Sequence, residues 1–114
     1  MKNIFAVVVM VVALEGCSTV ANIRTDDAAT MDLQPTNAKA VKVYSTAKIG
    51  QEYTVIGEVV ADADAGEQAA ISVDKLKVEA AKLGADAIIN LRLEIDAGYF
   101  QSAIKATGTA VKIK

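Results

Sequence analysis

Cys17 has the most reactive side chain in this sequence, and it is the only cysteine among 114 residues. It follows an apolar run from Ile4 to Leu14 and stands directly after Gly16. The sequence contains no histidine, which is the usual general base near neutral pH and a common zinc ligand. Nucleophile pairs that depend on histidine are therefore excluded. We expect a chain that is not an enzyme and has no metal site and no cofactor.

Residues 1–16 have the features of a secretory leader, which is removed from the mature protein. Lys2 precedes eleven consecutive apolar residues, and a small residue, Gly16, ends the segment. The apolar run is too short for a transmembrane helix, which needs about 20 apolar residues. We therefore predict a signal peptide over residues 1–16. One alternative is an ordinary leader that is followed by a free thiol.

The four residues Leu14-Glu15-Gly16-Cys17 resemble the lipobox of bacterial lipoproteins. This resemblance implies that the chain is cut before Cys17, that the thiol receives a diacylglycerol and that the new amino terminus is acylated too. Two or three acyl chains hold a protein stably on a membrane, whereas one chain holds it weakly. Ser18 stands where an Asp would favour the inner membrane. The resemblance thus implies an outer-membrane lipoprotein that faces the periplasm.

The stretch of residues 17–38 shows neither helical nor strand periodicity. It is rich in Thr, Asp, Asn and Ala and contains the only proline, Pro35. Such a composition is typical of a flexible linker. We therefore predict a lipid-anchored tether over residues 17–38 and a folded domain over residues 39–114. The alternative is that part of this stretch lies against the domain.

The spacing of apolar residues in the domain changes along the sequence, from a strand-like to a helical period and back to a strand-like one. Two strands precede one helix, and two strands joined by a turn follow it. The predicted elements are strands over residues 41–44 and 53–60, a helix over 67–83, and strands over 87–95 and 103–114. This order predicts a small two-layer α+β domain, in which one amphipathic helix packs on a mostly antiparallel four-stranded sheet.

Periodicity also predicts which side of each element is buried. The helix has one apolar face, and Gly84 follows it as a left-handed helix stop. This face consists of Ala69, Val73, Leu76, Ala80 and Leu83. The odd residues from Ala87 to Ile95 are apolar, so we expect that side of the strand to lie under the helix. In the last strand the apolar parity changes after Ala106, which predicts a β-bulge at Gly108-Thr109.

Three blocks of the domain resemble the YbjQ/RcsF-like group of small bacterial domains. The blocks are Tyr53–Val59, Ala81–Asn90 and Ala106–Val111. The RcsF branch implies an outer-membrane lipoprotein that signals envelope stress through partner proteins and is held by disulfides, whose cysteines are absent here. The YbjQ branch implies heavy-metal binding and ring-shaped oligomers, yet ligands for a soft metal are almost absent from this chain.

Three polar groups could form sites, and each has a simpler interpretation. The acidic segment after the second strand hints at a calcium loop, but its spacing favours a solvated turn. It contains Asp62, Asp64 and Glu67, with Gly66. Asp86 stands at a strand entry, where we expect a hydrogen bond that stabilises a turn. Arg92 and Glu94 share one strand face and form either a polar site or, by default, a solvent-facing ladder.

Two pairs of apolar residues are candidates for partner binding. Tyr99 and Phe100 stand at the predicted hairpin tip, and aromatic side chains dominate the energetics of interfaces. Alternatively, one of them closes the end of the core. Ile71 and Val78 lie on the helix face opposite the core, in a strip that an oligomer could bury. The alternative is ordinary scattered exposure of apolar residues.

The sequence thus favours a membrane-anchored envelope protein that acts as a protein-interaction, assembly or stress-sensing module. Its expected partners are the membrane, through acylated Cys17, and an envelope protein or a second copy of the chain. The 12 basic and 14 acidic residues form no clustered positive patch, so nucleic acid is not expected. The alternative function is an envelope domain that binds a small ligand or a metal ion, in a monomer or a ring-forming oligomer.

Overall fold

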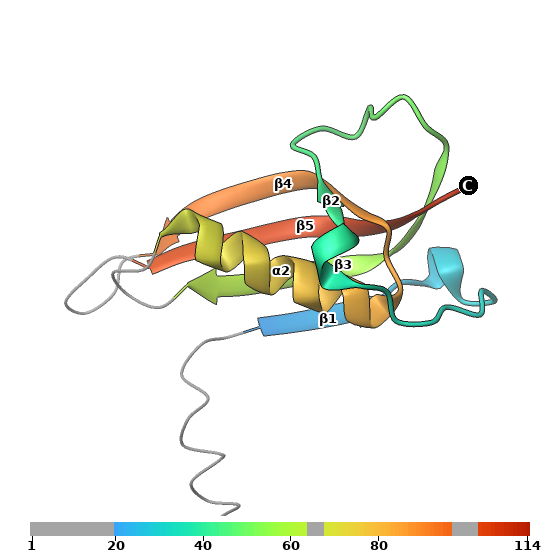
Figure 1. Cartoon of the computed structure of the whole chain (residues 1–114), viewed down its shortest axis with the longest axis horizontal. Coiled ribbons are helices and arrows are strands. Elements are labelled where there is room, and N and C mark those ends of the chain that lie inside the picture. Colours follow the sequence, from blue (N-terminus) through green and yellow to red (C-terminus); the bar gives the residue numbers. More distant parts are fainter. Residues whose placement is uncertain (1–19, 64–67, 97–102) are drawn as a thin grey trace, which may run out of the picture.

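A computed structural model describes residues 20–63, 68–96 and 103–114 of the protein (Figure 1). Five strands form one sheet in the order β1-β3-β5-β4-β2, and the helix α2 packs on one face of it. The elements are β1 (Val20–Arg24), the 3-10 helices η1 (Asp26–Ala28) and η2 (Ala38–Ala40), β2 (Lys42–Val43), β3 (Tyr53–Ala63), α2 (Ala69–Leu83), β4 (Ala87–Asp96) and β5 (Ala103–Ile113). Several predictions fall outside the described residues, namely those on the signal peptide, Cys17, Asp64, Gly66, Glu67, Tyr99 and Phe100.

The predicted α+β architecture is confirmed, although the sheet has five strands rather than four. The pairs β1–β3, β3–β5 and β5–β4 are antiparallel, whereas the short β2 runs parallel to β4. Within the described segments, no helix is both long enough and apolar enough to span a bilayer.

The additional strand lies in the stretch that the sequence predicts as a tether, and that prediction is wrong over residues 20–38. β1 pairs antiparallel with β3, so that Val20 stands opposite Ala61 and Arg24 opposite Gly57. All five side chains of β1 are exposed, so its sequence shows no alternation of apolar and polar residues. The strand is held by its backbone hydrogen bonds to β3, which periodicity cannot reveal.

The residues that follow β1 also pack on the domain. Ala28 is fully buried, and Met31 packs against the core beneath α2. The guanidinium of Arg24 donates hydrogen bonds to the carbonyl oxygens of these two residues. The Thr36 hydroxyl donates a hydrogen bond of 2.6 Å to the carbonyl oxygen of Ala85, just after the helix. The stretch is therefore part of the folded domain.

The main core lies between α2 and the sheet. Leu76 and Ala80, which belong to the predicted apolar helix face, are fully buried there together with Ile56 of β3. The helix ends at Gly84, whose φ of 92° is the left-handed conformation that the sequence predicts. A Cβ at this position would lie 2.7 Å from the carbonyl oxygen of Gln34, so the position requires glycine for packing as well.

A second, smaller core lies on the opposite face of the sheet, under the loop of residues 44–52. It consists of buried Ala87, Ile89 and Val111, against which Tyr44, Ile49, Tyr53, Val55 and Ile113 pack. This core explains the parity change in β5, because Ala110 faces α2 while Val111 faces the loop. The predicted bulge at Gly108-Thr109 is wrong, since both residues pair with Val59 and Glu58 of β3 in unbroken register.

The irregularities in register lie instead in the two strands beside β5. β3 shifts between Val55 and Gly57, and β4 shifts between Ile89 and Arg92. Within the β4 shift, Asn90 has a φ of 54°, a left-handed value that asparagine tolerates better than most residues. Each neighbour of β5 thus contains an additional residue, while β5 itself stays regular.

The shift in β4 changes which of its residues face the helix. Ile88 and Leu91 pack in the core beneath α2, whereas Ala87 and Ile89 face the loop of residues 44–52. Farther along the strand, Ile95 is 77% exposed. The prediction that the odd residues from Ala87 to Ile95 all lie under the helix is therefore wrong, although the strand itself is confirmed.

Candidate functional site

The outer face of the sheet, opposite α2, is covered over only part of its length. The loop of residues 44–52 covers the part that contains Ala87 and Val111, and the strands continue beyond it. We name the remainder the open sheet face, which consists of Ala21, Ile23, Glu58, Val60, Arg92, Glu94, Lys105, Thr107 and Thr109. These residues belong to neither core. Both hydrophobic cores therefore form without these side chains.

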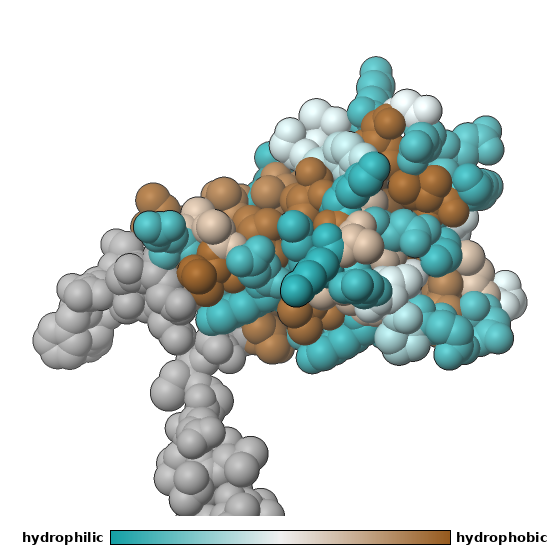
Figure 2. All heavy atoms as spheres, in the orientation of Figure 1, coloured by the Kyte–Doolittle hydropathy of each residue, from teal (hydrophilic) through white to brown (hydrophobic). Residues whose placement is uncertain are grey.

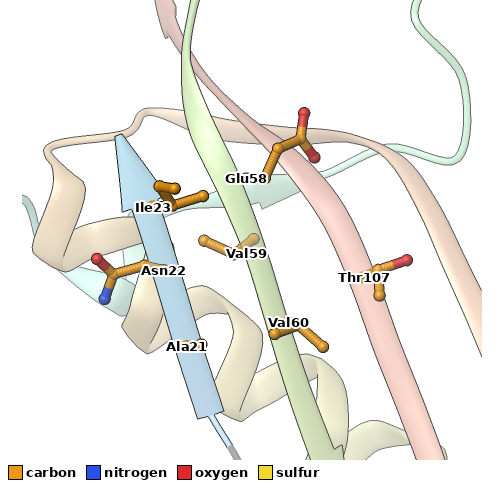
Figure 3. Close-up of a pocket in the computed structure, with 7 residues that line it drawn as sticks. All are labelled: Ala21, Asn22, Ile23, Glu58, Val59, Val60 and Thr107. Atoms are coloured by element: carbon orange, nitrogen blue, oxygen red, sulfur yellow. The ribbon is translucent and has the colours of Figure 1, made fainter. Parts of the chain in front are cut away.

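Strand alternation assigns these side chains to the outer face. Val59 and Ala61 of β3 belong to the core beneath α2, so Glu58 and Val60 point the other way. Residues that stand opposite one another in an antiparallel ladder share a face, and Ile23 of β1 stands opposite Glu58. Figure 3 shows Ile23 on β1 beside Glu58 and Val60, which take alternate positions on β3.

A hollow of about 270 Å³ lies on β1 and β3 at this face (Figure 3). It is lined by Ala21, Asn22, Ile23, Glu58, Val59, Val60 and Thr107. Ala21 and Val60 stand opposite each other, and Ile23 beside them is 64% exposed. The hollow therefore presents aliphatic side chains to whatever contacts the sheet here.

Charged and hydroxyl side chains surround the aliphatic residues of this hollow, and several of them stand opposite one another on neighbouring strands. The Thr109 hydroxyl lies 2.9 and 3.1 Å from the two carboxylate oxygens of Glu58, to which it donates. Lys105 of β5 stands opposite Asp62 of β3 on one side and opposite Glu94 of β4 on the other. Opposite charges on neighbouring strands stabilise a sheet by about 0.2–1 kcal/mol per pair. Glu94 thus takes the ladder position that the sequence favours, and Asp62 belongs to a strand rather than to the predicted turn.

A buried carboxylate connects the edge strand β1 to the helix. Glu79 of α2 is only 4% exposed. Its Oε1 accepts a hydrogen bond of 2.9 Å from the Asn22 amide, and its Oε2 lies 2.8 Å from the Lys82 ammonium. A buried charge is tolerated when such partners satisfy it. This contact could not be predicted, because Glu79 falls outside the apolar helix face and Asn22 lies in a strand that hydrophobic periodicity does not reveal.

Asp86 has a structural role, but its partners are more distant in the sequence than predicted. One carboxylate oxygen accepts a hydrogen bond of 2.9 Å from the backbone N–H of Ile113, and the other lies 3.2 Å from the Lys112 ammonium. The side chain therefore fixes the end of β5 to the entry of β4 and does not stabilise a local turn. Both oxygens are engaged, so Asp86 is not a candidate ligand.

The predicted helix strip and the open sheet face are separate surfaces. Val78 is 45% exposed and Ile71 is half-buried, and both belong to α2, which covers the other face of the sheet. In Figure 2, which shows the α2 side, hydrophilic residues lie among the apolar ones. One flat partner surface therefore could not contact both. Ile23 was missed as a candidate because the sequence places it in a tether.

A larger hollow of about 770 Å³ lies between β2 and α2 and has lysines around it. It is lined by Lys39, Ala40, Val41, Lys42, Val43, Tyr44, Val73 and Lys77. The lysines come from two distant segments of the chain, so the sequence did not predict their meeting. No buried polar side chain lines this hollow, since Lys39 and Lys42 are exposed and Lys77 is half-buried. We therefore do not assign a ligand to it.

Comparisons with known proteins support the fold, and one family model is similar to the second half of the chain. Residues 62–114 match the model of the YbjQ_1 family, which is described as "Putative heavy-metal-binding". The crystal structure of the Francisella virulence factor FvfA is similar, with a TM-score of 0.61 at 17% identity, over 82% of this chain and 96% of that chain. Likeness at this identity shows a shared fold. No curated protein matches the sequence.

The residues of the matched segment do not fit a site for a soft metal. Thiolate, thioether and imidazole groups are the ligands that select such metals, and residues 62–114 contain no Cys, Met or His. Among the side chains that the structure describes, no three of the types His, Cys, Asp and Glu lie close enough to hold a metal ion. The similarity to the YbjQ group therefore concerns the domain and not a recognisable metal centre.

Proposed function

We propose that this protein is a membrane-anchored interaction module of the bacterial cell envelope and has no enzymatic activity. The open sheet face is the observation that supports this proposal. Its strands are fixed by two cores, yet no described part of the chain covers it. A partner protein could bind this face without any rearrangement of the fold, as most preorganised interfaces do.

The open sheet face has the arrangement that protein interfaces share. An apolar centre around Ile23 and Val60 is surrounded by charged and hydroxyl side chains, such as Lys105 and Thr109. An apolar core within a polar rim is the usual anatomy of an interface. Full burial of an exposed isoleucine side chain contributes about 1.5–3 kcal/mol, and a partner that covers the 64% of Ile23 that is still exposed gains roughly two-thirds of that.

The edge strand β1 offers a second mode of contact beside the open sheet face. It is the first strand in the sheet order, so β3 pairs with one of its sides and no described strand pairs with the other. Unpaired backbone groups on an edge strand bind extended segments of other chains by β-strand addition. A partner could therefore contact Ile23 and the backbone of β1 together.

The lipid anchor is the second part of the proposal and is tested separately. Cells that express the protein are labelled with palmitate, and the label on the wild type is compared with that on a Cys17→Ser variant. We expect label on the wild type alone, because the cysteine thiol is the acylated group. Equal label on the variant would contradict the anchor.

The interaction is tested by two matched substitutions on opposite layers of the domain. Ile23→Asp and Val78→Asp each place a carboxylate at an apolar side chain, 64% and 45% exposed respectively. Complexes are cross-linked in intact cells and purified, and the attached proteins are identified by mass spectrometry. We expect Ile23→Asp to lose a recurrent envelope partner that Val78→Asp retains. Loss with Val78→Asp alone would favour the helix strip and contradict the role of the open sheet face.

A further inference from the structure

The position of β1 limits how far the folded domain can stand from a lipid anchor. β1 begins at Val20, three residues after Cys17. Consecutive Cα atoms are about 3.8 Å apart, so the Cα atoms of these two residues are at most about 11 Å from each other. A tether of residues 17–38 would have placed the domain a few nanometres from the lipid, which the strand excludes. This step depends on the lipid anchor proposed above.

The residues near Val20 show which part of the domain would lie closest to the lipid. The register of the sheet places Val20, Ala61, Ala106 and Leu93 in one row across four strands. The next row on the same face, farther from the loop of residues 44–52, contains Ala63, Ile104 and Ile95. We name the strand ends that contain these two rows the anchor end of the sheet.

The anchor end exposes large apolar side chains. Val20 is 41% exposed, Leu93 is 49% exposed and Ile95 is 77% exposed. These are three of the five large hydrophobic side chains that are exposed among the described residues. In Figure 2 apolar residues lie at the left end of the described domain, which is the end toward which β3 runs in Figure 1. The most exposed isoleucine of the described domain is therefore close to the predicted site of lipidation.

We propose that the anchor end of the sheet lies against the phospholipid bilayer and that Val20, Leu93 and Ile95 contact the lipid. The short connection to Cys17 holds this end at the membrane surface. There, the transfer of each apolar side chain from water into lipid is favourable and stabilises the contact. Asp62 and Glu94 stand on either side of Lys105 at this end, so attraction to anionic lipid is not the driving force. Contact is therefore expected on zwitterionic lipid and at high salt concentration.

The test measures the depth of labelled residues in the membrane. Lipidated protein is purified from cell membranes and reconstituted into phosphatidylcholine vesicles that contain nitroxide-labelled lipid. A fluorophore is attached to Ile95→Cys or, as the control, to Gln51→Cys, and the acylated Cys17 does not compete for the label. Gln51 is exposed and lies beyond the opposite end of β3, about 30 Å away along the strand.

We expect the nitroxide lipid to quench the label at position 95 several-fold more strongly than the label at position 51. Equal quenching at the two positions would overturn the proposal. Mass spectrometry of the same preparation reports the state of Cys17. Weak quenching on an acylated chain would refute this inference alone, whereas an unacylated chain on the membrane would refute the anchor itself.

A lengthened connection provides a second readout. Twenty Gly and Ser residues inserted between Thr19 and Val20 would span about 25 Å on average and release the domain from the surface. We expect quenching at position 95 to fall toward the level at position 51 in this variant. Unchanged quenching would show that the short connection does not determine the contact and would contradict the proposal.

Discussion

The two parts of the outer sheet face differ although β3, β5 and β4 run through both of them, and only the open part also includes β1. Under the loop of residues 44–52, Ala87 and Val111 are completely buried and Ile89 is 2% exposed. On the open sheet face, Ile23 remains 64% exposed beside polar neighbours. The covered part therefore stabilises the domain, while the open part contributes little to stability and is free to bind. The difference separates residues that hold the fold from residues that we assign to function.

The largest expected effect comes from the covered part. Ile89→Ala removes buried methyl groups beneath the loop and should lower the free energy of unfolding by about 2–5 kcal/mol, as cavity-forming substitutions do. Ile95→Ala is the matched control, because it makes the same change on the same strand at a side chain that is 77% exposed. The control should change stability by less than about 0.5 kcal/mol. Urea denaturation measures the stability of both variants. Equal losses of stability would contradict the distinction between the covered and the open part of the strand.

The connection between β1 and α2 should give a smaller effect. Asn22→Ala leaves one oxygen of the buried Glu79 carboxylate without its donor, which should cost about 1–3 kcal/mol. Hydrogen exchange should show that the backbone of β1 loses protection first. Thr109→Ala is the control, since it breaks an exposed hydrogen bond of the same 2.9 Å length. An equally large loss of stability in Thr109→Ala would show that burial of the acceptor carboxylate does not determine the cost of breaking the hydrogen bond.

The open part should tolerate change with little effect on folding. Ile23→Asp is expected to lower the free energy of unfolding by no more than about 1 kcal/mol, because the side chain belongs to neither core and the main cost is a new carboxylate opposite Glu58. Thermal and urea denaturation measure this directly. A loss of 2 kcal/mol or more, by the scale of buried-residue substitutions, would place Ile23 among the residues that hold the fold.

The smallest expected effect concerns metal ions. A ligand that binds the native state at 100 times its Kd stabilises the protein by about 2.7 kcal/mol. We expect no rise in Tm with Zn²⁺ or Cu²⁺, because the family-matched residues 62–114 contain no Cys, Met or His. A saturable rise that survives Cys17→Ser would identify a metal site and favour the ligand-binding alternative.

The elements with a clear hydrophobic period could be predicted from the sequence. α2 has its apolar stripe, its stop at Gly84 and its burial of Leu76 as expected, and the strands on both sides of it are where periodicity places them. The parity change in β5 was a real signal that had a different cause. It marks a strand that is buried on both faces, and Val111 contacts a loop whose position has no signal in the sequence.

The open sheet face could not be predicted for a related reason. β1 has five exposed side chains and joins the sheet by backbone pairing, so its residues resemble a linker in composition. Ile23 becomes a candidate only when its register opposite Glu58 is known. The shift at Asn90 likewise reverses the faces of β4, and alternation alone cannot detect an additional residue. The helix and the strands can therefore be predicted from the local hydrophobic periodicity. The residues of the open sheet face can be found only from the pairing of strands that are distant in the sequence.

Site-specific photo-cross-linking in intact cells tests the central claim most directly. A photoreactive amino acid replaces Ile23 in one variant and Val78 in another, and the adducts are separated by mass and identified. The proposed function predicts an adduct with an envelope protein from position 23 and none from position 78. The absence of an adduct at position 23, or the same adduct from both positions, would contradict the open sheet face as the interaction surface.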